Sequence, residues 1–306
     1  MTASTRRRGA GRRLVTVAAT VGLLLASCGG GGAEDPLRVG LIPNISPEQQ
    51  AARYEPLGDY LSERLDREVQ LFVATNYAGV VQAMASGRID VAYFGGITYL
   101  QTERLVAVEP LVTEIDAMTG TSRYLSAIVV RNDSPFQDLT DLFDARASIA
   151  MGDVASTSGS YAPRSMLVAA GAMCDPRDLR RCEPLSEVEF TGGHDAAAQS
   201  VVQGRTDAAG LELRILRRLE LQGAVPEGSL RVIAQQEVEG YPWVARSDIG
   251  RETIDAVIAA FLAIDDPDLL DLLRATRYTR VRAEDYATMR AEAEAFGILA
   301  AIESAG

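Results

Sequence analysis

Between residues 37 and 236, short apolar runs alternate with stretches whose apolar residues recur at helical spacing. Such alternation is typical of strand–helix–strand units, in which strands pair in parallel and helices cover both faces of the sheet. After residue 243 we find helical patterns only. The pattern therefore predicts an α/β fold with mostly parallel sheets and a helical C-terminal tail. The predicted strands are 37–43, 69–75, 90–95, 125–131, 148–153, 188–192, 208–212 and 231–236. The predicted helices are 46–65, 77–86, 139–146, 161–171, 195–204, 213–222, 251–264, 266–276 and 283–299.

One short pattern occurs twice and indicates two similar lobes. Gly87-Arg88-Ile89-Asp90 recurs as Gly204-Arg205-Thr206-Asp207, each time between a helical pattern and a predicted strand. We predict a first lobe from 37–125 and 239–306 and a second lobe from 126–238. The chain would then cross between the lobes twice, as in a hinged clamp. Because ligands of open α/β sheets bind beyond the carboxyl ends of strands, we expect one site in the cleft between the lobes.

The first 27 residues have the pattern of an export signal. Five arginines between residues 6 and 13 precede thirteen mostly apolar residues, 14–26. This run is too short for a bilayer, which needs about 20 residues, and it suits a signal peptide. Leu25-Ala26-Ser27-Cys28 resembles a lipobox, so we expect residues 1–27 to be removed and Cys28 to be lipidated. The glycine-rich residues 28–36 would form a flexible tether. An ordinary cleaved signal with an incidental cysteine is the alternative, and export by the Sec or the twin-arginine route stays open.

The net charge and the cysteine content limit which binding partners and which covalent links we expect. The 306 residues include 30 basic and 42 acidic ones, a net charge of −12, and every basic residue is arginine. Because nucleic-acid binding needs a basic face, we do not expect a nucleic-acid partner. In an oxidising compartment, Cys174 and Cys182 form an even pair, for which we predict a disulfide. Metal binding is the weaker alternative, since two thiols and the single histidine, His194, do not make a metal site.

Six short segments together resemble the phosphate/phosphite/phosphonate-binding proteins of ABC importers. They are 76–79, 93–95, 124–135, 156–159, 193–195 and 204–207, and the resemblance covers roughly 37–250. It implies the two-lobe type 2 periplasmic binding protein fold, a small phosphorus oxyanion as ligand, and an ABC transporter permease as partner. It implies a monomer that needs no cofactor.

The serine-rich segment and the histidine are the strongest candidates for ligand contact. Ser156, Thr157 and Ser158 precede a predicted helix, whose exposed N–H groups and macrodipole attract anions. The alternative is that one serine only caps the helix. His194 follows two glycines at a second predicted helix start, where the resemblance implies a ligand-contacting histidine. A hydrogen bond to an anionic oxygen would favour its charged form.

Four further residues complete the predicted site. Tyr77 opens a helix and can donate a hydrogen bond, although it could equally be a core aromatic. Tyr93 and Phe94 are neighbours on a strand and point to opposite faces, so only one of them can face the ligand. The resemblance implies that Asp207 lies near the ligand, where it could accept a proton from P–OH and disfavour sulfate. Its counterpart Asp90 favours the alternative that Asp207 only fixes a turn.

A hydrolase is the competing function, because serine, histidine and aspartate occur in that order. The strained G-x-S-x-G elbow of such enzymes is missing from the sequence, so we expect a binding protein rather than an enzyme. We therefore predict a lipid-anchored solute-binding protein on the outer face of the cell membrane. It would capture a phosphorus oxyanion and deliver it to an import permease. The alternatives are a binder of another oxyanion or small organic acid, and an anchored sensor.

Overall fold

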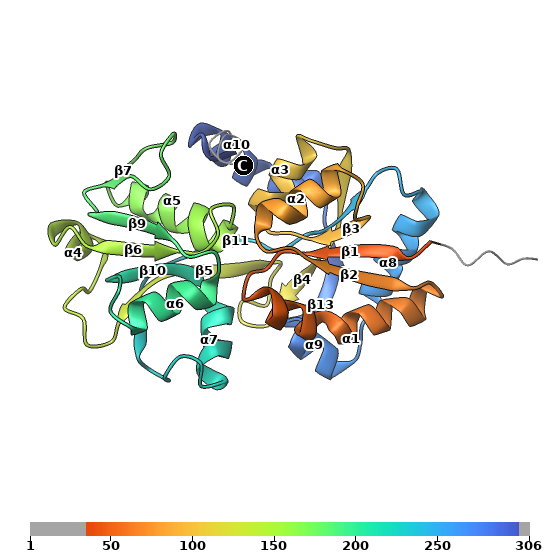
Figure 1. Ribbon diagram of the computed structural model, residues 1–306, viewed down its shortest axis with the longest axis horizontal. Coiled ribbons are helices and arrows are strands. Elements are labelled where there is room, and N and C mark those ends of the chain that lie inside the picture. Colours follow the sequence, from red (N-terminus) through yellow and green to blue (C-terminus); the bar gives the residue numbers. More distant parts are fainter. Residues whose placement is uncertain (1–34, 300–306) are drawn as a thin grey trace, which may run out of the picture. The chain divides into compact units, whose positions relative to one another are not determined.

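The computed structural model describes residues 35–299, which form two large mixed sheets with helices on both sides (Figure 1). The predicted signal peptide and Cys28 lie outside the described residues. The first sheet contains β1 (Leu37–Leu41), β2 (Val69–Val73), β3 (Val91–Tyr93), β4 (Val108–Asp116), β12 (Trp243–Arg246) and β13 (Ala275–Arg280). The second contains β5 (Arg123–Arg131), β6 (Ser148–Met151), β9 (Glu187–Phe190), β10 (Ala208–Glu212) and β11 (Leu230–Glu239). A small hairpin joins β7 (Met173–Cys174) to β8 (Cys182–Glu183).

Helices connect most of these strands. Around the first sheet lie α1 (Pro47–Leu65), α2 (Tyr77–Ala85), α3 (Gly96–Glu103), α8 (Arg251–Leu262), α9 (Pro267–Leu272), a 3₁₀ turn (Ala283–Tyr286) and α10 (Ala287–Ala295). Around the second lie α4 (Leu139–Asp144), a π-helical turn (Thr157–Tyr161), α5 (Ala162–Ala169), α6 (His194–Val202) and α7 (Leu213–Leu221). We call these two groups the first half and the second half. Among the described residues, no helix has the length and apolar character needed to cross a bilayer.

The two sheets share one topology. Five strands of the first sheet have the order β4-β12-β3-β1-β2, and the second has the order β11-β5-β10-β6-β9. In the first sheet β3, β1 and β2 pair in parallel, and β12, which the chain reaches from the second half, pairs antiparallel with β3. In the second sheet β10, β6 and β9 pair in parallel, and β5, which the chain reaches from the first half, pairs antiparallel with β10. The α/β class is thereby confirmed, whereas the sheets are mixed rather than mostly parallel. The residue boundaries of the two lobes stay a prediction.

The prediction of an all-helical C-terminal tail was wrong in two places. Trp243–Arg246 and Ala275–Arg280 are strands, and both pair antiparallel with β4. β12 also pairs with β3, in the interior of the first sheet. β12 has four residues and β13 has six, with helices close by, so neither was long enough to show a clear strand period.

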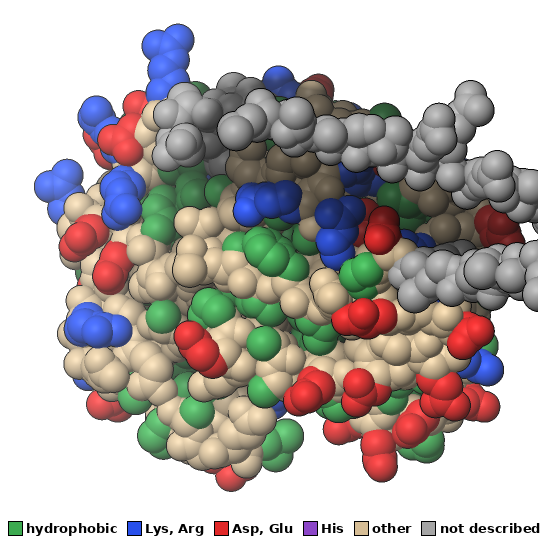
Figure 2. All heavy atoms as spheres, turned by 45° about the vertical axis from the view of Figure 1, so that its right-hand side comes forward, with side chains coloured by type: hydrophobic (Ala, Val, Ile, Leu, Met, Phe, Trp, Pro, Cys, Tyr) green, Lys and Arg blue, Asp and Glu red, His purple; other side chains and the backbone are tan. Residues whose placement is uncertain are grey.

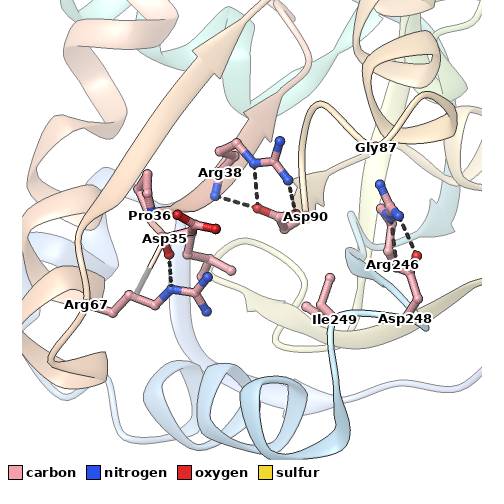
Figure 3. A pocket seen from close by; sticks show the side chains of 10 residues that line it. Asp35, Pro36, Arg38, Arg67, Gly87, Asp90, Arg246, Asp248 and Ile249 are labelled. Carbon is pink, nitrogen blue, oxygen red and sulfur yellow. Dashed lines mark hydrogen bonds and ion pairs between the residues drawn. The ribbon is translucent and has the colours of Figure 1, made fainter. Parts of the chain in front are cut away.

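The repeated sequence pattern has the same structure in both halves. Gly87 and Gly204 both have a left-handed backbone, with φ of 72° and 69°, which favours glycine. Asp90 lies just before β3 and accepts hydrogen bonds from the backbone and guanidinium of Arg38 on β1 (Figure 3). Asp207 lies just before β10 and accepts hydrogen bonds from the backbone N–H and hydroxyl of Ser148 on β6, both 2.8 Å long. Each aspartate therefore forms hydrogen bonds with the amino end of the neighbouring parallel strand, Asp90 with β1 and Asp207 with β6.

Alternate residues of the strands supply the core of the second half. Ala127 and Val129 of β5 pack toward α6 and α7, while Ile128 and Val130 pack toward α5. This two-residue period is what a strand covered on both faces requires. The surface is predominantly acidic, in agreement with the net charge, and acidic side chains gather on the lower right of the face in Figure 2.

Candidate functional site

The serine-rich segment forms a tight turn at the carboxyl end of β6. The Ser156 hydroxyl accepts a hydrogen bond from Gly159 N, 3.0 Å away, so Ser156 takes the capping role. Ser158 is fully buried, and its hydroxyl has no hydrogen-bond partner among the described residues. A Cβ on Gly159 would lie 2.8 Å from Cε1 of His194, so only glycine allows the turn to approach the imidazole this closely. The turn that carries the unpartnered Ser158 hydroxyl therefore lies against the imidazole of His194.

His194 is the first residue of α6 and is almost completely buried. Its Nδ1 accepts a hydrogen bond from the backbone N–H of Glu212, 3.2 Å away, so the proton of the neutral ring lies on Nε2. Nε2 has no partner among the described residues. Burial lowers the pKa of His194 to about 4, although Glu212 and Asp195 oppose the shift. The ring is therefore a neutral donor at neutral pH.

Side chains of the second half cap helices of the first half. The hydroxyl of Thr157 accepts a hydrogen bond from Ile97 N, 3.0 Å away, at the start of α3. Asp153 accepts one from Tyr77 N, 3.3 Å away, at the start of α2. The backbone N–H of His194 also donates to the carbonyl of Asn44, 3.1 Å away. The two halves therefore meet around the serine turn in a closed arrangement.

The predicted aromatic residues form a buried wall on the side of the first half. Tyr77 is the first residue of α2, and burial raises its pKa well above 10, so the phenol keeps its proton. The ring of Tyr93 stacks on Tyr241 with centroids 4.9 Å apart, and its hydroxyl accepts a hydrogen bond from Arg274. Phe94 is fully buried in the core of the first half. Tyr93 thus belongs to the polar part of the wall and Phe94 to the apolar core.

Tyr124 is a site residue that the sequence analysis did not single out, although it opens one of the six family-like segments. It is buried, and its hydroxyl lies near those of Ser158 and Tyr241 but forms no hydrogen bond of regular geometry among residues 35–299. Its ring lies against the guanidinium of Arg214, with 4.7 Å from Cζ to the centroid. Burial raises the pKa of Tyr124, so its phenol is also a neutral donor.

A buried ionic network centred on Glu212 was also missed. Glu212 ends β10, and its carboxylate accepts hydrogen bonds from Arg214 Nε at 2.6 Å and from the Tyr241 hydroxyl at 2.5 Å. Arg214 also pairs with Glu114 and Asp116, at 3.1 and 2.8 Å. Burial alone would raise the pKa of Glu212, but Arg214 and Arg274 outweigh it and lower that pKa, so Glu212 is ionised. The carboxyl end of the predicted strand 208–212 was the available sequence signal.

The structure does not bring Asp207 to this cluster. Asp207 precedes β10 and Glu212 ends it, and a strand rises about 3.3 Å per residue, so the two carboxylates lie at opposite ends of the strand. Asp207 bonds to Ser148, as its counterpart Asp90 bonds to Arg38. We therefore exclude Asp207 from the site.

Two further predictions from the sequence concern a disulfide and the lack of a metal site. Cys174 and Cys182 form the predicted disulfide across the β7–β8 hairpin. Among residues 35–299, no group of three or more His, Cys, Asp or Glu side chains could hold a metal ion.

The structure has two α/β sheets of one topology, which two chain crossings join. The two halves meet around buried neutral donors that have no partner among the described residues. This arrangement defines a substrate-binding protein of the periplasmic type. The family described as "ABC transporter, phosphonate, periplasmic substrate-binding protein" matches residues 39–286, and the chain belongs to this family. Proteins of this family are substrate-binding components of transporters, so the expectation that the chain is not an enzyme is confirmed.

Individual relatives agree with this assignment. The phosphate-import protein PhnD of Mycolicibacterium smegmatis is 27% identical over 262 residues, which cover 81% of each chain. The phosphonates-binding periplasmic protein of Escherichia coli is 26% identical, over 75% of this chain and 66% of the relative. The structure of PhnD1 from Prochlorococcus marinus in complex with methylphosphonate has a TM-score of 0.74 at 22% identity, covering 86% of this chain and 98% of that one. That likeness shows the shared fold.

Proposed function

We propose that this protein is a lipid-anchored, extracytoplasmic solute-binding protein that captures a small phosphorus oxyanion: phosphate, phosphite or a phosphonate. It would deliver this ligand to the permease of an ABC importer. The observation that carries the proposal is the set of three buried donors without partners, Ser158 Oγ, His194 Nε2 and the Tyr124 hydroxyl. Buried donors are costly when unpaired, so a ligand rich in acceptor oxygens would satisfy them. The names of the relatives, which include phosphate import and phosphonate binding, support the same ligand class.

The ligand would bind between the two proposed lobes, 37–125 with 239–306 and 126–238. Ser156 would shape the turn, Ser158 and His194 would donate to the oxyanion, and Tyr77 and Tyr93 would wall the site from the first half. Thr157 would act mainly by holding α3, because its hydroxyl already accepts a hydrogen bond there. Phe94 would pack without a polar contact. Neutral donors suit the binding of a buried anion, because the site then contains no charge of its own at these donors and the anion is the only charge that ligand binding buries.

Calorimetric titration with phosphate, phosphite, methylphosphonate, sulfate and a small organic acid tests the ligand class. We expect at least one phosphorus oxyanion to bind more tightly than sulfate or the organic acid. Ser158→Ala and His194→Gln should each weaken it by about tenfold or more, because a hydrogen bond to a charged group contributes about 1.5–3 kcal/mol. Asp207→Asn is the matched control outside the cluster and should bind normally. Preference for the organic acid, or unchanged affinity in both site variants, would contradict the proposal.

Membrane fractionation tests the anchor separately. Cys28→Ser should move the protein from the membrane to the soluble fraction without altering ligand affinity, because acyl chains contribute about 0.8 kcal/mol per buried CH₂ to membrane binding. A variant that stays with the membrane would refute lipidation at Cys28. Uptake of the ligand into cells with and without the permease tests the transport role. If the purified protein still binds the ligand but cells without the permease no longer import it, the protein serves transport rather than acting as an anchored sensor.

A further inference from the structure

Three arginines converge on a second region, which borders the Glu212 network at Arg274. Arg53 comes from α1, Arg218 from α7, and Arg274 follows α9. Two cavities of about 640 and 700 Å³ adjoin here, since Arg53 and Arg218 line both of them. Arg274 lines the first cavity and has a left-handed backbone, with φ of 61°, which is unfavourable for a residue other than glycine.

These guanidinium groups have few partners. Both terminal nitrogens of Arg218 are buried without a hydrogen bond among the described residues, and so is Nε of Arg53. Arg53 Nη2 donates to the carbonyl of Leu272. Arg274 is 9% exposed, and its Nε lies 4.0 Å from Glu212 Oε1, beyond hydrogen-bond distance. Within residues 35–299, neither Arg53 nor Arg218 forms an ion pair with a carboxylate.

The charges around the cluster leave it positive. Glu212 lies beside Arg274 but is already hydrogen-bonded to Arg214 and Tyr241. Asp268 and Asp271 border the first cavity and Asp195 borders the second. Burial, together with the charges of Arg274 and Arg53, lowers the pKa of Arg218 to about 9. Like charges held together at a cavity are destabilising unless an anion joins them.

We propose that Arg53, Arg218 and Arg274 form a second anion-binding site, which takes a small multivalent oxyanion. Guanidinium groups suit this ligand because their planar forks donate paired hydrogen bonds to phosphate or carboxylate oxygens. The site is distinct from the serine turn, because neither Ser158 nor His194 lines the two cavities and the bonded Glu212 side chain adjoins Arg274. The assignment holds whichever ligand the serine turn binds.

The second site has a consequence for closure. Arg53 and Arg274 belong to the first half and Arg218 to the second, so an anion bound by all three bridges the halves. Such an anion favours the closed arrangement and therefore raises affinity at the serine turn. The effect is reciprocal, since a ligand at the serine turn raises the affinity of the second site by the same factor.

Calorimetry with inorganic diphosphate tests the site. The wild-type protein should bind one diphosphate in addition to its oxyanion ligand, and Arg218→Gln should weaken diphosphate binding by about tenfold or more. Arg53→Gln tests the same site from the first half and should also weaken diphosphate binding. It replaces Arg218→Gln as the test if that variant does not fold. Arg277→Gln, which removes an exposed arginine outside both cavities, should bind diphosphate normally. In the absence of phosphate, Ser158→Ala should also bind diphosphate as the wild-type protein does, although it loses affinity for phosphate.

Three results would overturn the second site. The first is a lack of diphosphate binding to the wild-type protein. The second is unchanged binding in both Arg218→Gln and Arg53→Gln. The third is one-for-one competition between diphosphate and phosphate with a total stoichiometry of one, which would mean that the arginines hold the far end of a single ligand. Failure of Ser158→Ala to weaken phosphate would instead count against the proposed function and leave the second site standing.

Discussion

The single histidine gives a quantitative prediction. In the folded protein burial lowers the pKa of His194 to about 4, whereas an exposed histidine has a pKa of 6.5. Because the unfolded chain binds the proton more readily, folding stability that is fully present above pH 6.5 is lost as the pH falls toward 4. A difference of one pKa unit corresponds to about 1.4 kcal/mol, so His194 should remove about 2 kcal/mol between pH 7 and pH 5 and roughly 3 kcal/mol by pH 4.

NMR can follow this group without an assignment problem, because the chain has only one histidine. The imidazole of the protein without added oxyanion should titrate near pH 4 and should carry its neutral-form proton on Nε2, because an anion bound at Nε2 would itself raise the pKa. Denaturant unfolding at pH 7 and pH 5 then measures the stability change. His194→Asn is the reference for both experiments, since its amide oxygen can still accept the hydrogen bond from Glu212 N. The stability difference between wild type and His194→Asn should fall by about 2 kcal/mol from pH 7 to pH 5.

An imidazole that titrates near 6.5 in the closed protein would refute this reasoning, because it would mean that the ring is solvated or paired with a free carboxylate. A proton on Nδ1 would refute the hydrogen bond from Glu212 N. Equal pH dependence in wild type and His194→Asn would show that the carboxylates alone cause acid destabilisation.

Three further substitutions test other parts of the structure. Asp207→Asn should lower the free energy of unfolding by about 1–2 kcal/mol, because it weakens the bonds to Ser148, and should leave anion selectivity unchanged in calorimetry. A change in selectivity would return Asp207 to the site. Thr157→Val should remove the cap of α3 and cost about 1 kcal/mol of the closed state, visible as a severalfold weaker ligand affinity; full affinity would mean that this contact does not stabilise closure. Glu212→Gln should destabilise the protein by about 2 kcal/mol in denaturant unfolding, and an unchanged midpoint would contradict the buried ionic network.

The sequence predicted best where local patterns decide the structure. The helix predicted over 46–65 agrees with α1, because Ser46 caps this helix and Pro47 is its first residue, and capping depends on neighbouring residues. The repeated glycine and aspartate were also visible, and the alternative interpretation of Asp207 as a turn residue agrees with the structure. The family-like segments indicated the serine turn and His194, which the structure brings together.

The features that were missed depend on pairing between distant residues. β12 pairs with β3 and β4, which lie more than one hundred residues earlier, and no local pattern encodes that register. The environment of His194 depends on Glu212, whose charge is in turn held by Arg214. In the structure the arginine takes up the negative charge, and burial then decides the protonation state.

The shared topology of the two sheets allows the two halves to be compared element by element. In that comparison α2 corresponds to α6, because each leads from an outer parallel strand to the strand that carries the repeated aspartate. Tyr77 and His194 are the first residues of these helices and are therefore equivalent positions in the two halves. At this position the first half has a phenol and the second half an imidazole. Two equivalent positions in the two halves therefore carry two different neutral donors, and exchanging Tyr77 and His194 would show how far each half depends on its own donor.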